Sequence, residues 1–275
     1  YTHCFFVSGG NIMHLLDSFR NNFKCIPVIH EVAAGIAAEY FNEISDKNKK
    51  AIALVTAGPG LTNIVTAISG AYLESRDLLI IGGQVKTDDL ANGEVIQRGI
   101  QEIEGVSIVT PITSKALRIE KPIGFEKLKS ILNIDIVERK GPIFIEIPLD
   151  VQASKFKDVK TSTKIKKQIL NIATKTQVNQ ISALLRKSKR PSMLIGGGVS
   201  RDVAYDLRKQ FSKLDIPIFT TWNGMDRISA LSKNYFGMPN TWGQRHANII
   251  IRQSDLLLAL GTRLGLQQTG FNWKE

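Results

Sequence analysis

Three short segments of this sequence combine residue types that can hold a ligand, and each lies between an apolar run and a helical pattern. Glu31 follows His30 at a strand-to-helix junction, where the positive end of the helix dipole stabilises a carboxylate. On spacing alone, an ordinary acid in the first helical turn is the simpler interpretation of Glu31. The other two segments are glycine-rich turns, at residues 56–60 and 196–198.

Glycine turns between a strand and a helix let backbone amides approach a phosphate or a flat ring. Residues 56–60 read Thr-Ala-Gly-Pro-Gly, and Gly196, Gly197 and Gly198 form a triple glycine. The triple glycine is similar to a dinucleotide-binding turn, which makes a nucleotide-binding oxidoreductase one alternative function. It lacks the G-x-G-x-x-G spacing with a downstream acid, and tight packing of strand on helix explains it equally well.

Other catalytic signatures are missing from the sequence. It contains no P-loop, no H-E-x-x-H and no C-x-x-C, so we predict no metal ion held by this chain's own residues. Two cysteines, Cys4 and Cys25, cannot build a disulfide framework, and we expect both to be reduced core residues. The cytoplasm is therefore the expected compartment.

The elements that must position these segments alternate between buried strands and helices. Strands are predicted at residues 3–7, 26–29, 51–55, 78–81 and 143–147. Helical spacing of apolar residues separates them, and Asn11 can cap the first helix. Apolar strands with intervening helices predict an α/β fold with a parallel sheet covered on both faces.

The same alternation restarts in the second half of the chain. Strands are predicted at residues 192–195, 216–219 and 256–260, with helices at 178–185 and 203–214. We therefore predict two doubly wound parallel-sheet domains, at residues 1–152 and 177–275, joined by a lysine-rich linker at 153–176. The second domain is expected to be incomplete, because little chain follows its last strand.

Composition restricts the classes of function. The chain has 275 residues with 43% hydrophobic and 22% charged residues, which excludes disorder as the main state. The sequence contains no run of 18 apolar residues, so we predict no membrane-spanning helix. The first apolar stretch is not preceded by the basic region of a secretory signal, so we predict no such signal there.

Charge offers one further alternative, a nucleic-acid-binding module. Lys and Arg number 36 against 25 Asp and Glu, which gives a net charge of +11. More than half of this excess lies between Lys155 and Lys175, in a segment without a nucleic-acid motif. A solvated linker explains that segment, so we expect neither nucleic acid nor a membrane as a partner.

Taken in order, the motifs are far more specific than any one of them. Together they resemble the thiamine diphosphate enzymes of the acetolactate synthase type over nearly the whole chain. The segments that carry the resemblance are residues 6–10 (FVSGG), 30–34 (HEVAA), 56–63 (TAGPGLTN), 82–85 (GGQV), 145–151 (IEIPLDV), 191–198, 220–224 (TTWNG) and 255–263.

The resemblance implies roles for residues of the first domain. Glu31 matches the glutamate that hydrogen-bonds the aminopyrimidine ring of the cofactor and promotes loss of the thiazolium C2 proton, so we predict it to be catalytic. Gly58, Pro59 and Asn63 match residues around the ring. Gln101 matches a glutamine near the reacting centre and is the second predicted catalytic residue.

The resemblance also suggests FAD in the central domain, where several family members hold it without using its redox chemistry. Arg139 matches an arginine beside the flavin, and a guanidinium can pair with diphosphate oxygens. The other matching positions are Gly196, Gly197, Gly198, Thr221, Gly237, Met238, Gly261, Thr262 and Arg263.

The family binds diphosphate and Mg²⁺ through a third domain, and nothing after residue 150 fits its motif. We therefore expect that domain to be absent from this chain, and residues 1–275 alone to be inactive. In the family the phosphate half of the site comes from a partner subunit, which implies a homodimer or homotetramer.

The function implied is a decarboxylating carboligase that acts on a 2-keto acid, with pyruvate as the expected donor. Alternatives within the family are transfer of the two-carbon unit to a keto-sugar and simple decarboxylation. Ser8, Ile100 and the pair Ser114-Lys115 depart from the acetolactate synthase pattern. We expect them near the substrate side, where they leave the acceptor open.

Overall fold

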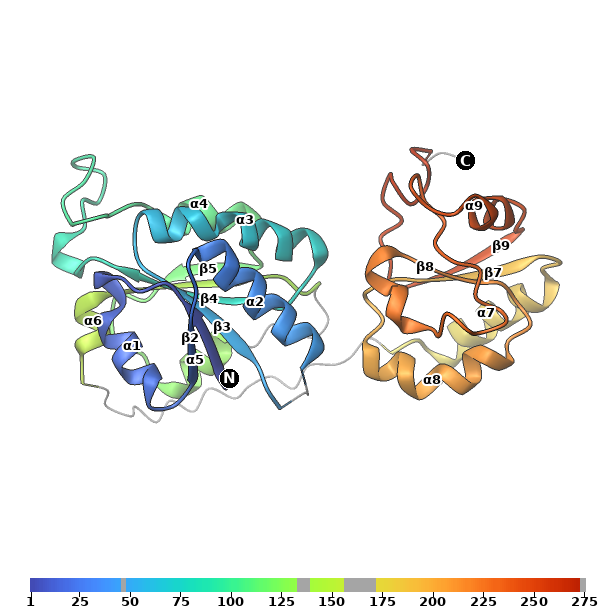
Figure 1. Ribbon diagram of the computed structural model, residues 1–275, viewed down its shortest axis with the longest axis horizontal. Helices are drawn as coiled ribbons and strands as arrows, with labels where there is room; N and C mark the ends of the chain where they lie inside the picture. The colour runs from blue at the N-terminus through green and yellow to red at the C-terminus, as the bar shows by residue number, and fades with distance from the viewer. Residues whose placement is uncertain (46–47, 133–138, 156–171, 273–275) are drawn as a thin grey trace. The chain divides into compact units, whose positions relative to one another are not determined.

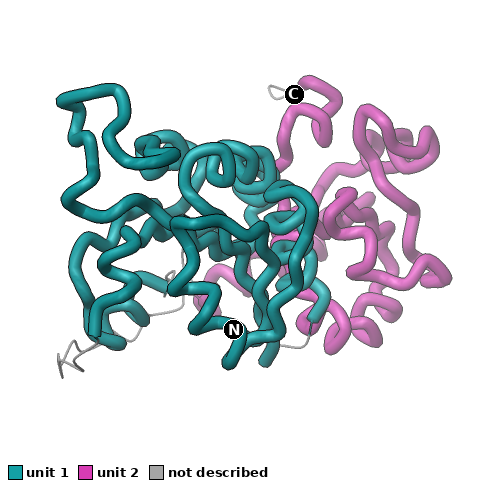
Figure 2. Tube along the Cα trace, turned by 60° about the vertical axis from the view of Figure 1, so that its left-hand side comes forward, with its two compact units in different colours: residues 1–170 teal, residues 171–275 magenta. Residues whose placement is uncertain are grey.

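The chain folds into two compact units, residues 1–170 and 171–275 (Figure 2). The computed structural model describes residues 1–45, 48–132, 139–155 and 172–272. The boundary between the units falls within the segment 153–176 that the sequence predicts as a linker. Residues 156–171, which carry most of its lysines, lie outside the described residues.

The first unit is built on a six-stranded parallel sheet with the strand order β2-β1-β3-β4-β6-β5. Its strands are β1 (His3–Phe6), β2 (Lys24–Pro27), β3 (Ala51–Val55), β4 (Leu79–Gln84), β5 (Lys115–Arg118) and β6 (Ile143–Pro148). All five residues of β3 are buried, because helices cover both faces of the sheet at its centre.

Helices lie on both faces of this sheet (Figure 1). They are α1 (Met13–Arg20), α2 (Glu31–Ile44), α3 (Pro59–Glu74), α4 (Gly105–Val109), α5 (Phe125–Leu132) and α6 (Leu149–Ala153), with 3-10 turns at Gly10–Ile12, Thr87–Asp89 and Thr110–Ile112. One hydrophobic core joins α2, α3 and α4 to one face, and a second joins α1, α5 and α6 to the other.

The second unit has a three-stranded parallel sheet with the order β8-β7-β9. Its elements are α7 (Lys175–Lys187), β7 (Pro191–Ile195), α8 (Arg201–Lys213), β8 (Ile218–Thr220), a 3-10 helix at Trp222–Arg227, α9 (Arg245–Arg252) and β9 (Leu256–Leu260). The core residues of α8 and of α9 belong to two separate clusters on this sheet. Both units thus have the parallel α/β architecture that the sequence predicts.

Two local expectations have clear outcomes. Both thiols are free, with Cys4 opposite Cys25 in the register of β1 and β2, and burial raises the pKa of Cys4 to about 12. The prediction that Asn11 caps the first helix is wrong. Ile12 is the residue before α1, and the Asn11 amide instead donates to the carbonyl of Ile100 at 3.3 Å. Of the described helices, none is long and apolar enough to cross a membrane.

Candidate active site

The carboxyl ends of β1 and β3 form the topological switch point of the first sheet. From β1 the chain passes to β2 on one side, while β3 lies on the other side of β1. The segments that leave the two strands are in close contact, since a Cβ added at Gly9 would lie 2.4 Å from Cβ of Thr56. In open parallel sheets, ligands bind at the carboxyl edge at this point.

Glu31 lies at this edge as the first residue of α2. His30 is in an extended conformation before it, and its Nδ1 accepts a hydrogen bond from the backbone N–H of Val32 at 3.2 Å. The helix therefore starts at Glu31, whose side chain is in the first turn. Glu31 is only 7% exposed, and its Oε2 accepts a hydrogen bond from the amide of Asn63 on α3 at 2.9 Å.

The glycine turn after β3 lies against the other oxygen of Glu31. A Cβ added at Gly60 would be 3.5 Å from Oε1 of Glu31 and 2.8 Å from Cγ2 of Thr56. Within the described part of the chain, Oε1 accepts no hydrogen bond from another residue. One carboxylate oxygen is thus oriented by Asn63, while the other can accept a donor from a ligand.

Gln101 reaches the same turn from a distant part of the sequence. Gly58 has a φ of +63°, and a Cβ there would lie 2.7 Å from the Gln101 carbonyl oxygen and 2.8 Å from Gln101 Cβ. Only glycine fits this contact without a shift of one of the two backbones. The predicted pyrimidine residues and Gln101 are therefore together at one edge of the sheet.

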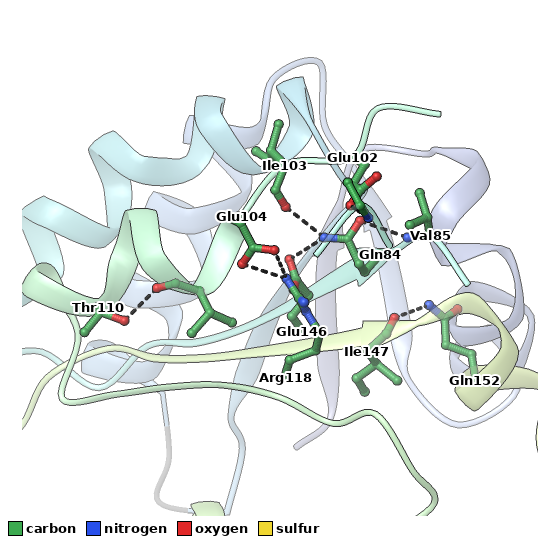
Figure 3. Close-up of polar contacts among 12 residues, drawn as sticks. Gln84, Val85, Glu102, Ile103, Glu104, Thr110, Arg118, Glu146, Ile147 and Gln152 are labelled. Carbon is green, nitrogen blue, oxygen red and sulfur yellow. Dashed lines mark hydrogen bonds and ion pairs between the residues drawn. The ribbon is translucent and has the colours of Figure 1, made fainter. Parts of the chain in front are cut away.

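A buried polar network lies beside this edge, with residues from the carboxyl ends of β4 and β5 and from the middle of β6 (Figure 3). Glu146 is 1% exposed at its side chain and pairs with Nε of Arg118 at 2.5 Å. Gln84 donates to Glu146 at 3.1 Å and to the carbonyl of Ile103 at 2.9 Å. Arg118 also pairs with Glu104 at 3.1 Å. The network therefore connects the sheet to the segment directly after Gln101.

Two opposing effects act on the pKa of Glu146 in this network. Burial raises the pKa of Glu146, while the hydrogen bond and the charge of Arg118 lower it, and burial is the larger effect. Arg118 is the cation that keeps the buried carboxylate compatible with ionisation. Among the described residues, no hydrogen bond or ion pair joins this pair directly to Glu31.

The positions assigned to a flavin divide into two groups. The first follows β7 and β9, where close packing explains the glycines. A Cβ added at Gly196 would lie 2.3 Å from the carbonyl oxygen of Gly261, and the N–H of Gly198 donates to that oxygen at 2.9 Å. A Cβ at Gly197 would lie 2.9 Å from Cβ of Asn223. Packing therefore accounts for the triple glycine without a ligand.

The second group lies along the carboxyl ends of β8 and β9. The Thr221 N–H donates to the carbonyl of Ile195, and the carbonyl of Gly237 accepts from Thr220. The N–H of Met238 donates to Gln244 at 2.7 Å. Thr262 and Arg263 follow β9, and the exposed Arg263 has no ionic partner among the described residues.

Arg139, also matched to a flavin position, belongs to the first unit. Its guanidinium donates to the hydroxyl of Ser75 and to the carbonyls of Tyr72 and Leu73, the latter at 3.1 Å. These groups end α3, at the amino edge of the sheet and opposite Glu31. Arg139 therefore acts as a cap on the helix carboxyl end in this structure.

Several residues that shape the edge were not among the predicted site residues. The predicted residues are contacted or oriented by Thr56, His30 and Asn11. Glu102 accepts hydrogen bonds from three backbone N–H groups. Glu102 directly follows Gln101, which is the one sequence signal that could have drawn attention to it. Among residues 1–45, 48–132, 139–155 and 172–272, no cluster of three His, Cys, Asp or Glu side chains can hold a metal ion.

Comparison with protein families gives two matches that together cover most of the chain. Residues 1–108 match the family described as "Thiamine pyrophosphate enzyme, N-terminal TPP binding domain". Residues 178–275 match "Thiamine pyrophosphate enzyme, central domain". The first match contains Glu31, Gly58, Asn63 and Gln101, and the second contains the whole β7–β9 sheet.

Curated relatives share one name. The chain is 28% identical to the mitochondrial acetolactate synthase of Schizosaccharomyces pombe, over 98% of this chain and 41% of that protein. It is 30% identical to a probable acetolactate synthase large subunit of Methanocaldococcus jannaschii, over 95% of this chain and 44% of that protein. It is 28% identical to the acetolactate synthase isozyme 1 large subunit of Escherichia coli, over 94% of this chain and 45% of that protein. The chain thus spans less than half the length of these relatives.

Proposed function

This chain belongs to the thiamine pyrophosphate enzyme family, and we propose that it serves a decarboxylating carboligase of the acetolactate synthase type. The observation that carries this proposal is the Glu31–Asn63 pair beside the Gly58–Gly60 turn, at the switch point of a unit that matches the N-terminal TPP binding domain. The names of the relatives favour pyruvate as donor and a second 2-keto acid as acceptor.

The residues at the switch point fit the pyrimidine ring of thiamine diphosphate. Oε1 of Glu31 has no protein partner among the described residues, and Gly60 leaves the space before it free of a side chain. When bound, the cofactor supplies the nucleophilic carbon that adds to the keto acid and the electron sink for decarboxylation. Diphosphate and Mg²⁺ are part of the proposal, with their ligands expected outside this chain.

Each protein group then has a defined task. Glu31 holds and releases a proton at the ring edge through its free oxygen, which is general acid–base catalysis. Asn63 keeps the Glu31 carboxylate in one orientation through its 2.9 Å hydrogen bond. Gly58 precedes α3 and Pro59 is its first residue, so the ring can approach the backbone closely at this turn, and Gln101 covers the turn.

The departures from the acetolactate synthase pattern bear on the acceptor. Ser8 is exposed next to the Gly9–Thr56 contact, and Ile100 is 83% exposed next to Gln101, so both lie at the proposed site. Ser114 and Lys115 lie elsewhere. They sit at the amino end of β5 and donate to the carbonyls of Pro142 and Ile131 at 2.9 and 2.8 Å. Our expectation that this pair borders the substrate is therefore wrong for this unit.

The full-length protein with thiamine diphosphate, Mg²⁺ and pyruvate is expected to release carbon dioxide and form acetolactate in a ratio of one to one. The colour reaction of decarboxylated acetolactate and a carbon dioxide assay measure the two products. Release of acetaldehyde without acetolactate would instead establish a simple decarboxylase. Product formation only after addition of a keto-sugar would establish two-carbon transfer to a sugar. Pyruvate-independent oxidation of a nicotinamide would favour the oxidoreductase alternative.

FAD in the central unit and assembly as a homodimer or homotetramer are further parts of the proposal. Arg263 supports FAD, because it is an exposed guanidinium at a carboxyl sheet edge with no ionic partner among the described residues. We expect Arg263→Ala to lower the flavin content of the purified full-length protein, measured by absorbance near 450 nm. Arg252→Ala, on α9, is the control and should leave it unchanged. Equal flavin content in both variants would exclude Arg263 as a ligand.

A further inference from the structure

We propose that Glu102 is a positioning residue, which holds Gln101 against the Gly58 turn by closing the loop that precedes it. This inference rests on the proposed function, because that function is what places Gln101 at the reacting centre. The loop follows β4 and extends away from the sheet (teal to green in Figure 1). Its residues 92–98 are all exposed, so packing contributes little to its shape.

The Glu102 carboxylate is the centre of this loop. It is 8% exposed, and its Oε1 accepts a hydrogen bond from the N–H of Ala91 at 2.5 Å. Its Oε2 accepts from the N–H groups of Arg98 and Gly99 at 2.9 and 3.0 Å. One side chain therefore ties together the beginning and the end of an eight-residue excursion.

The three hydrogen bonds to Glu102 favour its charged form. Burial alone would raise the pKa of Glu102, but the three N–H donors and the charge of Arg118 hold it below its usual value. A carboxylate with three donors and no competing acceptor stays ionised and binds each donor more strongly than a neutral oxygen would. A glutamine at this position would present an NH₂ group to at least one of these N–H donors.

Gln101 needs such support because of its backbone. Its φ of +61° lies in the left-handed region, which a residue with a side chain occupies only when its surroundings enforce it. Its neighbours are fixed on both sides: Asn11 donates to the carbonyl of Ile100 at 3.3 Å, and Gln84 donates to that of Ile103 at 2.9 Å. Glu102 supplies the connection to the loop itself.

Hydrogen exchange of the cofactor-free, full-length protein tests the first step. In Glu102→Gln we expect amide exchange across residues 90–101 to accelerate about tenfold or more, with β3 and β4 unchanged. Glu94→Gln is the matched control, since Glu94 is an exposed acid of the same loop whose carboxylate, among the described residues, pairs with the Arg98 side chain alone. If Glu102→Gln does not fold, Glu102→Asp keeps the charge and shortens its reach, and the same local acceleration is expected. Unchanged exchange in the folded variant would overturn the proposal.

A double-mutant cycle on acetolactate formation tests the second step. Glu102→Gln is expected to lower kcat by about 10²-fold, the scale of an ångström-sized misplacement, with a smaller change in KM. Gln101→Ala is expected to lower kcat similarly, and the double variant to be no slower than Gln101→Ala. Losses that multiply in the double variant would show that Glu102 acts independently of Gln101. An unchanged kcat in Glu102→Gln beside a low kcat in Gln101→Ala would equally overturn the positioning role.

A structural measurement separates this inference from the proposed function. A crystal structure of Glu102→Gln is expected to show Gln101 with negative φ and displaced from Gly58. If the wild-type protein forms no acetolactate, the proposed function fails. The crystal structure of Glu102→Gln then decides by itself whether Glu102 positions Gln101. Gln101 retained at positive φ against Gly58 would overturn the inference whatever the activity.

Discussion

Replacing Glu31 with glutamine is expected to slow exchange of the C2 proton of bound thiamine diphosphate by about 10²–10⁴-fold in the full-length protein. Glutamine keeps the shape of the side chain and can still accept the bond from Asn63, but it cannot take up and release a proton. Glu31 is buried, and its Oε1 has no partner among the described residues. The substitution therefore removes proton transfer at Oε1 and leaves the rest of the side chain's contacts in place. Deuterium exchange at C2, followed by NMR after acid quench, measures the rate.

Asp17→Asn is the control for this experiment, because Asp17 is an exposed acid on α1 of the same unit, paired with Arg20. Its exchange rate should equal that of the wild type. Cofactor affinity should be measured for both variants so that loss of binding is not mistaken for slow exchange. A Glu31→Gln protein that binds cofactor and exchanges at the wild-type rate would show that another group removes the proton.

Arg118→Met is expected to lower the free energy of unfolding of the first unit by about 3–5 kcal/mol at pH 7, the usual cost of leaving one partner of a buried ion pair uncompensated. Glu146, at 1% exposure, would lose its 2.5 Å partner and keep only the hydrogen bond from Gln84. Native-state hydrogen exchange of β3 and β4 amides measures this free energy without interference from the second unit.

The pH dependence of this deficit follows from the sign of the Glu146 shift. Burial already raises the pKa of Glu146, and loss of Arg118 removes the hydrogen bond and the positive charge that oppose burial most, leaving the weaker effect of the Gln84 hydrogen bond. The folded variant therefore binds the Glu146 proton more tightly than the unfolded chain does, so the deficit should be smaller at pH 5 than at pH 7. Arg20→Met, at an exposed pair, should change stability by less than about 0.5 kcal/mol. An equal loss of unfolding free energy in Arg118→Met at pH 5 and pH 7 would contradict the conclusion that the uncompensated charge is on Glu146.

Prediction of the fold succeeded for the central strands, and it missed one edge strand of the first sheet. The apolar runs that form β3, β4 and β6 are long and nearly all buried, so their pattern is strong. The strand β5 (KALR) was missed because it is a four-residue edge strand, only partly buried, that mixes lysine and arginine with apolar residues. Asn11 was assigned to the wrong role because a capping residue type also suits a hydrogen bond to a distant carbonyl.

At the candidate site, the sequence predicted the residue types and left their partners open. Glu31 and Asn63 are 32 positions apart, and their contact exists because α2 and α3 pack side by side on the same face of the sheet. Arg139 matches a family position beside a flavin, which stays a prediction, and in this structure its guanidinium caps the carboxyl end of α3. A matching residue type therefore does not specify which groups its side chain contacts.

The alternation of strands and helices, and the junctions that carry Glu31 and the Gly58 turn, are local properties that the amino-acid order specifies directly. A strand covered on both faces must be apolar along its length, and a parallel strand must be followed by a crossover, so both leave a readable pattern. The role of Glu102 leaves no such pattern. Its three donors belong to Ala91, Arg98 and Gly99, and they converge on one carboxylate only after the loop has closed. The left-handed backbone of Gln101 likewise lies against Gly58, which is 43 positions away, and next to the Ile100 carbonyl, which accepts from Asn11, 89 positions away from Ile100. These residues meet only because β1, β3 and the loop end at one edge of the sheet.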